Sequence, residues 1–524
     1  MQPYRLTLNH FLEHAARWHG DVCVVTGGSG DARARVPYTQ LKARSQALSG
    51  ALLALGLKHA DHLAVMAWNS HAHLECWYGA MGIGVVCHTL NPRLSRTQLA
   101  DMIRQAGDRL LIVSADLTPL AAQLVTLCPM LEHLIVLEEP GTAPALPDCP
   151  HPRTWHYEEL LRQPGQDVPW GEFDENSAAG LCFTSGTTGA PKGVVYTHRS
   201  NYLHTLHQLQ ADVSGLTASD SVLVSVPMFH ANGWGLPFAG PAVGAKLVLP
   251  GRHQDGASLT RLINAEEVTI AAGVATVWLG LVDYLDQSGE EVPSLQRIML
   301  GGSSVPQGLM DRLEQRLGAT VQTSWGMTEL SPIGTVTPAT AVQRRSSQAG
   351  RPIMGVELMI TAQDGQALER GQKGHLHVRG ASVIERYFGQ DTSAVDAEGW
   401  FDTGDLATLD EAGILSITGR AKDLIKSGGE WINPAEIEAI VGALPEVALV
   451  AVVGRADPKW GERPVLIVEA RKGAHISDEV LLAALRPRVA KWWLPDAIVH
   501  LSAMPIAMTG KIDKNRLQAE YGSS

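Results

Sequence analysis

The chain has 524 residues, of which 45% are hydrophobic and 18% charged, a composition typical of a folded globular protein with room for roughly two to four domains. The 54 acidic side chains outnumber the 42 basic ones, and this acidic balance argues against a nucleic-acid-binding protein. The 6 cysteines form no CxxC pair, which argues against a zinc site or a redox dithiol and fits a reducing compartment.

The N-terminus lacks the apolar core of a signal peptide, and no apolar stretch is long enough to cross a bilayer. We therefore expect a cytoplasmic protein without an integral membrane segment.

Short apolar runs alternate with helix-length amphipathic segments through most of the chain, which favours α/β layers with largely parallel sheets. The predicted strands are Leu63–Trp68, Leu110–Ser114, His133–Leu137, Gly180–Thr184, Ser221–Val226, Ala245–Leu249, Val268–Ala272 and Arg297–Leu300. The predicted helices between them include Thr39–Leu55, Thr197–Ser214, Ser258–Glu267 and Gln307–Gly318.

The pattern changes after Gly355, where short apolar runs joined by Gly and Asp turns predict a smaller β unit. Its strands are Val356–Thr361, His375–Arg379 and Ile414–Thr418. A compact α+β pattern follows, with helices Pro434–Leu444 and Asp478–Trp492 and strands Val447–Val453, Val465–Glu469 and Ala497–Leu501. We expect a boundary near Gly419–Asp423, which divides the chain into domains 1–420 and 421–524.

The strongest local motif is Thr-Ser-Gly-Thr-Thr-Gly-Ala-Pro-Lys-Gly at Thr184–Gly193, between a predicted strand and a predicted helix. Hydroxyls, glycine amides and one lysine in a tight loop are the groups that bind a polyphosphate. The loop is not a Walker A motif, because Pro191 stands where a glycine should precede the lysine.

This string resembles the phosphate loop of the adenylate-forming enzymes, which include acyl-CoA synthetases, adenylation domains of peptide synthetases, and luciferases. Five further segments resemble motifs of that superfamily in the same order, so that the resemblance extends over nearly the whole chain. They are Gly301–Pro306, Gln322–Glu329, Trp400–Asp405, Gly419–Glu430 and Pro505–Lys511. The resemblance implies a large N-terminal domain of two α/β subdomains plus a small β-barrel-like unit, followed by a small, mobile α+β C-terminal domain.

The resemblance also implies ATP, Mg²⁺ and coenzyme A as cofactor and co-substrates. Trp325 offers an indole face to adenine, Thr328 a hydrogen bond to the α-phosphate, and Glu329 a carboxylate to Mg²⁺. Asp405 would accept hydrogen bonds from the ribose hydroxyls, and Arg420 would bind ribose or phosphate. The full implied nucleotide set is Thr184, Ser185, Gly186, Thr187, Thr188, Gly189, Lys192, Gly302, Ser303, Ser324, Trp325, Gly326, Asp405 and Arg420.

Three parts of the C-terminal region carry implied roles. Lys511 would stabilise the negative charge that builds up as a carboxylate attacks the α-phosphate. Lys422 would be the hinge about which the C-terminal domain rotates between the two half-reactions. Ser427, Gly428, Gly429 and Glu430 would line the route of the CoA pantetheine arm.

The segment Pro227–Trp234 resembles the acyl-pocket segment of fatty-acyl-CoA synthetases. His230 would lie between the acid and the thiol, Trp234 would gate an apolar tunnel, and Ile333 would line the pocket. Cys87–Leu94, Asp457–Glu462 and Lys491–Pro495 also resemble the medium- and long-chain group. The resemblance therefore implies a medium- to long-chain fatty acid, with a short thioether, branched, cyclic or aryl acid as the alternative.

Other functions stay open at this point. Only 13 residues follow Lys511 in the 524-residue chain, too few for an appended carrier domain, so free CoA is expected and a separate carrier protein is the rival acceptor. A luciferase-like oxygenase shares the adenylation step, and a non-catalytic acyl- or nucleotide-binding protein would have no need of Lys511. The oligomeric state is open, with a homodimer as one expectation.

Overall fold

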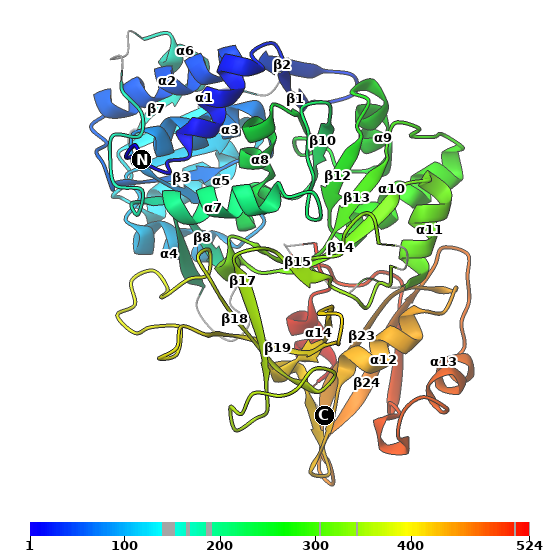
Figure 1. The fold of residues 1–524 in the computed structure, drawn as a ribbon. Coiled ribbons are helices and arrows are strands. Elements are labelled where there is room, and N and C mark those ends of the chain that lie inside the picture. Colours follow the sequence, from blue (N-terminus) through cyan, green and yellow to red (C-terminus); the bar gives the residue numbers. More distant parts are fainter. Residues whose placement is uncertain are drawn as a thin grey trace.

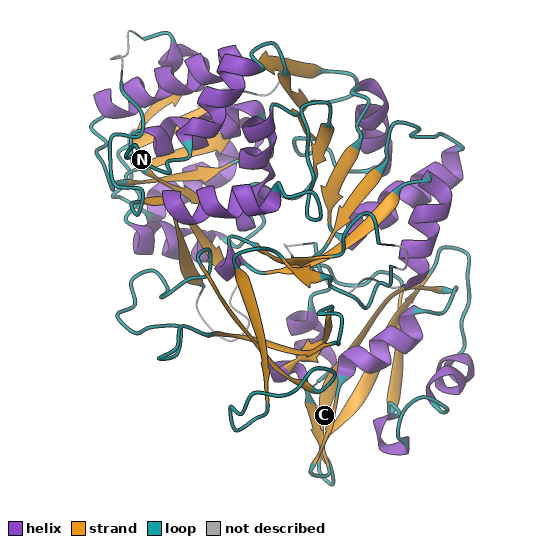
Figure 2. Ribbon diagram, viewed as in Figure 1, coloured by secondary structure: helices purple, strands orange, loops and turns teal. Residues whose placement is uncertain are grey.

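Two large sheets, a smaller β unit and a C-terminal α+β unit make up the molecule (Figures 1 and 2). The computed structural model describes residues 1–138, 152–163, 168–184, 191–302, 305, 307–341, 344–507 and 510–522. The strand–helix alternation expected from the sequence is confirmed, and the chain has the mixed α/β architecture that it predicted.

The larger of the two sheets has nine strands in the order β16-β15-β14-β13-β12-β10-β11-β1-β2. Its central strands, from β14 to β1, run parallel, and antiparallel strands close both edges. The strands are β1 (Cys23–Gly27), β2 (Arg33–Pro37), β10 (Ser221–Val224), β11 (Lys246–Leu249), β12 (Ile270–Gly273), β13 (Arg297–Leu300), β14 (Thr320–Gly326), β15 (Ile333–Val336) and β16 (Arg351–Pro352).

The second sheet has seven strands in the order β7-β6-β5-β3-β4-β8-β9, all parallel except for the pair β8/β9. The strands are β3 (His62–Met66), β4 (Val86–Thr89), β5 (Leu110–Ser114), β6 (His133–Leu137), β7 (Arg153–His156), β8 (Ala178–Thr184) and β9 (Lys192–Thr197). The helix predicted after the phosphate loop is confirmed, but a strand that the sequence did not predict comes before it. The chain first returns along β8 as β9, and the helix begins only at His198.

Helices cover both faces of each sheet, because strands buried on both sides need apolar partners on both sides. One core lies between the two sheets and includes the fully buried Trp77, Tyr78 and Phe238. A second core packs α9, α10 and α11 on the far face of the nine-stranded sheet, and a third packs α4 and α5 on the seven-stranded one. The N-terminal helices are α1 (Asn9–Trp18), α2 (Tyr38–Ala54), α3 (His71–Gly82), α4 (Arg96–Ala106), α5 (Thr118–Leu127), α6 (Tyr157–Leu161), α7 (His198–Gln208), α8 (Leu236–Val243), α9 (Gly256–Ala265), α10 (Ala275–Ser288) and α11 (Gln307–Leu317).

The helix expected over 197–214 ends at Gln208. The carbonyl of Gln208 accepts hydrogen bonds from both the backbone N–H (2.9 Å) and the hydroxyl of Ser214 (2.6 Å). These bonds close a turn, which Gly215 completes with a φ of +52°.

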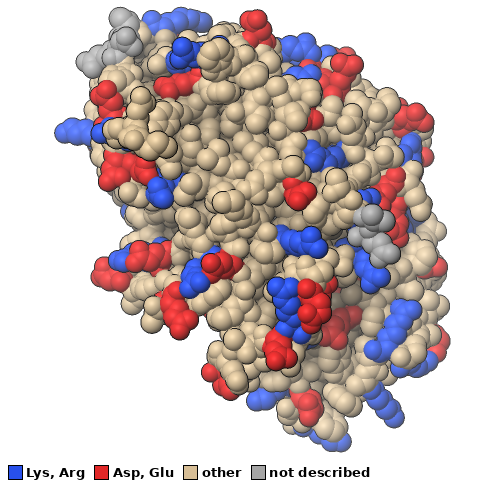
Figure 3. All heavy atoms as spheres, viewed as in Figure 1, with Lys and Arg blue, Asp and Glu red and all other residues tan. Residues whose placement is uncertain are grey.

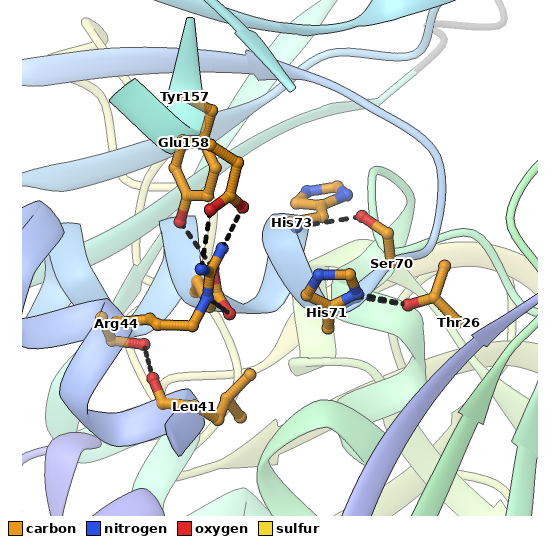
Figure 4. A network of polar contacts seen from close by, with 10 residues as sticks. Thr26, Leu41, Arg44, Ser70, His71, His73, Tyr157 and Glu158 are labelled. Atoms are coloured by element: carbon orange, nitrogen blue, oxygen red, sulfur yellow. Dashed lines mark hydrogen bonds and ion pairs between the residues drawn. The ribbon is translucent and has the colours of Figure 1, made fainter. Parts of the chain in front are cut away.

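A partly buried ion-pair network joins α2, α3 and α6 (Figure 4). The Arg44 guanidinium donates to Glu75 Oε1 at 2.7 Å and to both carboxylate oxygens of Glu158. The Tyr157 hydroxyl donates to the other oxygen of Glu75 at 2.7 Å. Glu75 is fully buried, and burial raises its pKa to about 7 in spite of these partners.

The smaller β unit is an antiparallel sheet in the order β17-β18-β19-β20, which is open between β17 and β20 in the pairing of the described residues. Its strands are β17 (Val356–Thr361), β18 (Lys373–Gly380), β19 (Phe401–Leu409) and β20 (Leu415–Arg420). This sheet corresponds to the predicted β-barrel-like unit, although no closed barrel is seen among the described residues.

The C-terminal unit is a five-stranded sheet with helices against it, at the lower right of Figure 1. It contains β21 (Ile425–Ser427), β22 (Glu430–Ile432), β23 (Val447–Asp457), β24 (Gly461–Ala470), β25 (Ala497–Leu501), α12 (Pro434–Gly442), α13 (Asp478–Leu485) and α14 (Lys514–Tyr521). The helix predicted over 478–492 ends at Leu485, because Pro487 cannot continue a helix.

Charges of both signs are interspersed on the face drawn in Figure 3, with wide uncharged areas between them. Within the described residues, none of the helices combines the length and the apolar character that crossing a membrane requires.

Candidate functional site

The carboxyl ends of parallel strands β10, β12, β13 and β14 meet at one edge of the nine-stranded sheet, toward the C-terminal unit (Figure 1). Ligands of open α/β sheets bind at such an edge, because loops there leave a crevice. Gly301 follows β13 so closely against β14 that a Cβ on it would lie 2.4 Å from Ser324 Oγ. The predicted residues Gly302, Ser324, Trp325 and Gly326 are therefore brought together.

Asp405 connects the β unit to this edge. The Trp325 indole N–H donates to Asp405 Oδ2 at 2.8 Å, and Arg420 Nε lies 2.7 Å from Asp405 Oδ1. Asp405 is 2% exposed, and burial raises its pKa although Arg420 and Trp325 act in the opposite direction. A carboxylate held in place by two donors is oriented to accept hydrogen bonds from vicinal hydroxyls.

Glu329 presents a second buried carboxylate, in a short 3₁₀ turn after β14. The Tyr387 hydroxyl donates to its Oε1 at 2.9 Å, and the Lys192 ammonium lies 4.7 Å from the centre of the Tyr387 ring. Burial raises the pKa of Glu329, a cost that a bound cation would relieve.

Glu329 could supply one protein ligand to Mg²⁺, but the substrate and water would have to supply the others. A carboxylate is a preferred ligand of the ion, but no group of three or more acidic, His or Cys ligands occurs among the described residues. The remaining ligands would therefore be water and phosphate oxygens. Thr328 lies beside Glu329, and its backbone carbonyl accepts from the Tyr196 hydroxyl at 2.9 Å.

Lys511 reaches the same edge from the C-terminal unit. A Cβ on Gly302 would lie 3.6 Å from Lys511 Cε, and the Thr276 hydroxyl donates to the Gly510 carbonyl at 2.9 Å. Burial and the nearby Arg420 lower the pKa of Lys511 to about 8, while Asp405 raises it. The Lys511 ammonium therefore lies beside the residues suited to a nucleotide. The hydrogen bond that seats its loop there joins Thr276 and Gly510, which are 234 residues apart in the sequence.

The acyl-pocket segment follows β10. His230 is half-buried, and burial together with Lys511 lowers its pKa to about 4, so its imidazole is neutral near pH 7. A small cavity beside it is lined by Thr89, Asn91, Leu94, Met102, Phe183 and Phe229.

The Trp234 indole lies against the loop that follows β13. Its Cη2 atom would be 3.3 Å from a Cβ on Gly301, and its Cζ2 atom 3.7 Å from one on Gly302. Ile333 is also buried, in a cluster with Val213, Val336, Ile353 and Val356. Its role as a pocket residue stays a prediction.

Lys422 and the proposed CoA segment lie on the C-terminal side of β20. Lys422 is exposed, in a short turn where its ammonium lies 3.7 Å from Asp423 Oδ1. The Gly428 N–H donates to the Trp460 carbonyl at 2.7 Å, and Arg463 donates to the Ser427 hydroxyl at 3.1 Å. Gly429 and Glu430 complete the hairpin between β21 and β22. Among the described residues, no hydrogen bond or ion pair joins this hairpin to the residues around Lys511.

Several predicted residues lie outside the described residues: Ser185, Gly186, Thr187, Thr188, Gly189 and Ser303. Of the phosphate loop, Thr184 and Lys192 are described and face each other across β8 and β9. Sequence reasoning missed Tyr387 and Thr276, because no local motif marks either of them. Only their contacts with Glu329, Lys192 and Gly510 identify them.

Comparison with known proteins agrees with this geometry. The chain matches the AMP-binding enzyme family over residues 11–388 and the AMP-binding enzyme C-terminal domain over residues 436–511. It is 39% identical to a 3-methylmercaptopropionyl-CoA ligase of Ruegeria lacuscaerulensis, over 99% of this chain and 98% of that one. It is 40% identical to a medium-chain-fatty-acid–CoA ligase of Ectopseudomonas oleovorans, over 100% of this chain and 97% of that one.

The fold is similar to the crystal structure of the anthranilate CoA ligase AuaEII in complex with anthranoyl-AMP, with a TM-score of 0.88, 22% identity, and coverage of 99% of this chain and 98% of that one. The family match and the full-length relatives show an enzyme of nucleotide-dependent chemistry. The chain belongs to the AMP-binding enzyme family.

Proposed function

We propose that this protein is an AMP-forming acid–CoA ligase that activates a medium- to long-chain fatty acid. In the first half-reaction a carboxylate oxygen attacks the α-phosphorus of ATP, and the bond to pyrophosphate breaks. In the second, the CoA sulfur attacks the acyl carbonyl carbon, and the bond to AMP breaks. The observation that carries the proposal is the seating of Lys511 beside Gly302 and Asp405.

The groups of the site suit the first half-reaction. Lys511 supplies a cation where two anions must approach each other and where charge grows on the phosphate oxygens. Asp405 and Arg420 would hold the ribose, and Trp325 the adenine. Glu329 would hold Mg²⁺, which when bound neutralises charge on the polyphosphate.

The second half-reaction needs a different arrangement of the C-terminal unit. Lys511 occupies the edge at which the thiol must arrive, while the hairpin Ser427–Glu430 contacts Trp460 and Arg463 in its own unit. We infer domains 1–420 and 421–524 that rotate about Lys422, so that the hairpin replaces Lys511. This exchange would let one site serve both steps.

The identity of the acid rests on the apolar surroundings of Trp234 and on the two relatives. One of them is named for a medium-chain fatty acid and the other for a short thioether acid. Each additional buried CH₂ contributes about 0.8 kcal/mol, so that an apolar pocket discriminates steeply by chain length.

The test is a pyrophosphate-release screen with CoA over saturated acids of graded length, with short thioether, branched and aryl acids included. A maximum of kcat/KM among medium or long saturated acids supports the proposal. A maximum at a thioether acid would change the assigned substrate to that acid and would leave the assignment as an acid–CoA ligase in place. If acyl-AMP forms but no CoA thioester does, or if the acyl group is transferred to a carrier protein, the assignment of CoA as the acceptor is wrong.

Two further expectations belong to this proposal. The described cysteines Cys23, Cys76, Cys87, Cys128 and Cys182 are all free thiols, which supports a reducing compartment such as the cytoplasm. A homodimer stays a prediction, and sedimentation at working concentrations would test it.

A further inference from the structure

The segment that carries Trp234 is a left-handed turn. The φ angles of Ala231, Asn232, Gly233, Trp234 and Gly235 are +45°, +53°, +55°, +55° and +74°. L-residues disfavour this region, a bulky tryptophan most of all, and such conformations persist only where their surroundings hold them. The structure around this turn must therefore contain the groups that hold it.

Gln208, the last residue of α7, is such a group. Its Nε2 donates to the Trp234 carbonyl at 2.9 Å, in a fully buried contact. Its Oε1 has no hydrogen-bond partner among the described residues and would lie 2.6 Å from a Cβ on Gly235, so Gly235 has no room for a side chain. The Gln208 amide therefore holds the C-terminal end of the turn through two contacts: a hydrogen bond to Trp234 and close packing against Gly235.

His204 lies one helical turn earlier on the same face of α7. Its Nε2 accepts the backbone N–H of Ile333 at 3.0 Å, and burial lowers its pKa to about 3, so that it is a neutral acceptor. One helix face therefore fixes the backbone at both Trp234 and Ile333.

The turn matters for the acid because of where it presents the indole. The Trp234 ring lies against Gly301 and Gly302, next to Lys511. A shift of the Trp234 carbonyl would swing the ring with it, because a left-handed turn without its hydrogen bond relaxes toward ordinary φ values.

We propose that Gln208 is a positioning residue for acid selection, acting through the Trp234 carbonyl to fix the ring that bounds the acid site. The proposal rests on the proposed function, since it assumes that the acid lies beside Trp234. It assigns to α7 a role in substrate choice although neither His204 nor Gln208 would touch the reacting atoms.

The test compares Gln208→Met with Thr205→Val. Methionine keeps the length of glutamine but cannot donate a hydrogen bond. Thr205 is equally buried on the same helix, but among the described residues its hydroxyl bonds only to the Asn201 carbonyl, at 2.7 Å. We expect Gln208→Met to change the kcat/KM ratio between long and short acids by about twofold to tenfold, the effect of one lost hydrogen bond. The KM for ATP should stay unchanged, and Thr205→Val should leave both quantities unchanged.

A second pair of variants covers the case in which Gln208→Met does not fold. Glycine tolerates positive φ and valine does not, so Asn232→Gly should keep the acid profile and Asn232→Val should shift it. An unchanged profile in Asn232→Val or in folded Gln208→Met overturns the inference. If Trp234→Ala alone shifts the profile, the ligase assignment survives without the role of Gln208. If no acid gives a CoA thioester with the wild-type protein, the proposed function itself fails.

Discussion

The hydroxyl of Thr276, at the start of α10, donates a hydrogen bond to the carbonyl of Gly510 at 2.9 Å. It ties the loop of Lys511 to the edge of the nine-stranded sheet. A Cβ on Gly510 would lie 3.1 Å from Val274 Cγ2, so the loop is seated closely there. If the C-terminal unit rotates as proposed, this bond breaks when Lys511 leaves the site, so the bond would favour the arrangement suited to adenylation.

Thr276→Val should accordingly slow adenylation alone. Loss of one hydrogen bond costs about 0.5–1.5 kcal/mol, which predicts a decrease of about twofold to tenfold in pyrophosphate exchange. Thioester formation from supplied acyl-AMP and CoA should keep its rate. Thr260→Val is the control, because the Thr260 hydroxyl bonds within α9 to Gly256. Equal losses in both half-reactions would mean that Thr276 only stabilises the fold.

Substitutions of Lys511 and of Lys422 should impair different half-reactions. Lys511→Ala removes the cation and should cost adenylation about 3 kcal/mol while leaving thioester formation nearly intact. Lys422→Pro stiffens the hinge and should impair thioester formation more, since proline fixes φ near about −65°. Each half-reaction is measured separately in both variants. Parallel losses in both would remove the rotation from the mechanism.

Glu329→Gln should weaken the use of Mg²⁺, because a neutral amide is a poor ligand for a divalent cation. The Mg²⁺ concentration for half-maximal adenylation should rise, with a lower maximal rate. Glu385→Gln is the matched control, an exposed carboxylate near Tyr387 that pairs with Arg386. A wild-type Mg²⁺ profile in Glu329→Gln would assign the ion to other groups.

Arg44→Met should destabilise the N-terminal region without changing substrate preference. It leaves the Glu75 carboxylate buried without its cation, which costs about 3–5 kcal/mol. Arg486→Met, which removes an exposed pair with Glu479, should change stability by less than about 0.5 kcal/mol. Urea unfolding followed by tryptophan fluorescence measures both. A midpoint of Arg44→Met equal to that of Arg486→Met would show that the network contributes little.

The buried strands were predictable because a parallel strand covered on both faces reads as a continuous apolar run. Leu110–Ser114, His133–Leu137 and Arg297–Leu300 were placed with both ends correct. The strand β9 was not predicted, because nothing in a short apolar run between a glycine-rich loop and a helix indicates that it pairs antiparallel with the preceding strand.

Many residues of the candidate site could be predicted because they belong to short sequence motifs in which glycines, hydroxyl-bearing residues and charged residues have a characteristic spacing. Contacts between distant segments could not be predicted. Nothing local joins Thr276 to Gly510 or Gln208 to Trp234, and no periodicity indicates a left-handed turn. Such features arise from packing that the linear order of residues does not display.

The pH dependence of adenylation gives the last prediction. Burial and Arg420 lower the pKa of Lys511 to about 8, so in the free enzyme its ammonium is charged below that pH and neutral above it. Because the proposed role needs the charged form, kcat/KM for pyrophosphate exchange should fall as pH rises through about 8, since kcat/KM reports groups of the free enzyme. Asp405 raises the pKa of Lys511, so Asp405→Asn should move the fall to lower pH. Lys511→Arg keeps its charge and should remove the fall, whatever activity it retains. A profile that declines equally in wild type and Lys511→Arg would assign the titration to another group and would leave Lys511 without its electrostatic role.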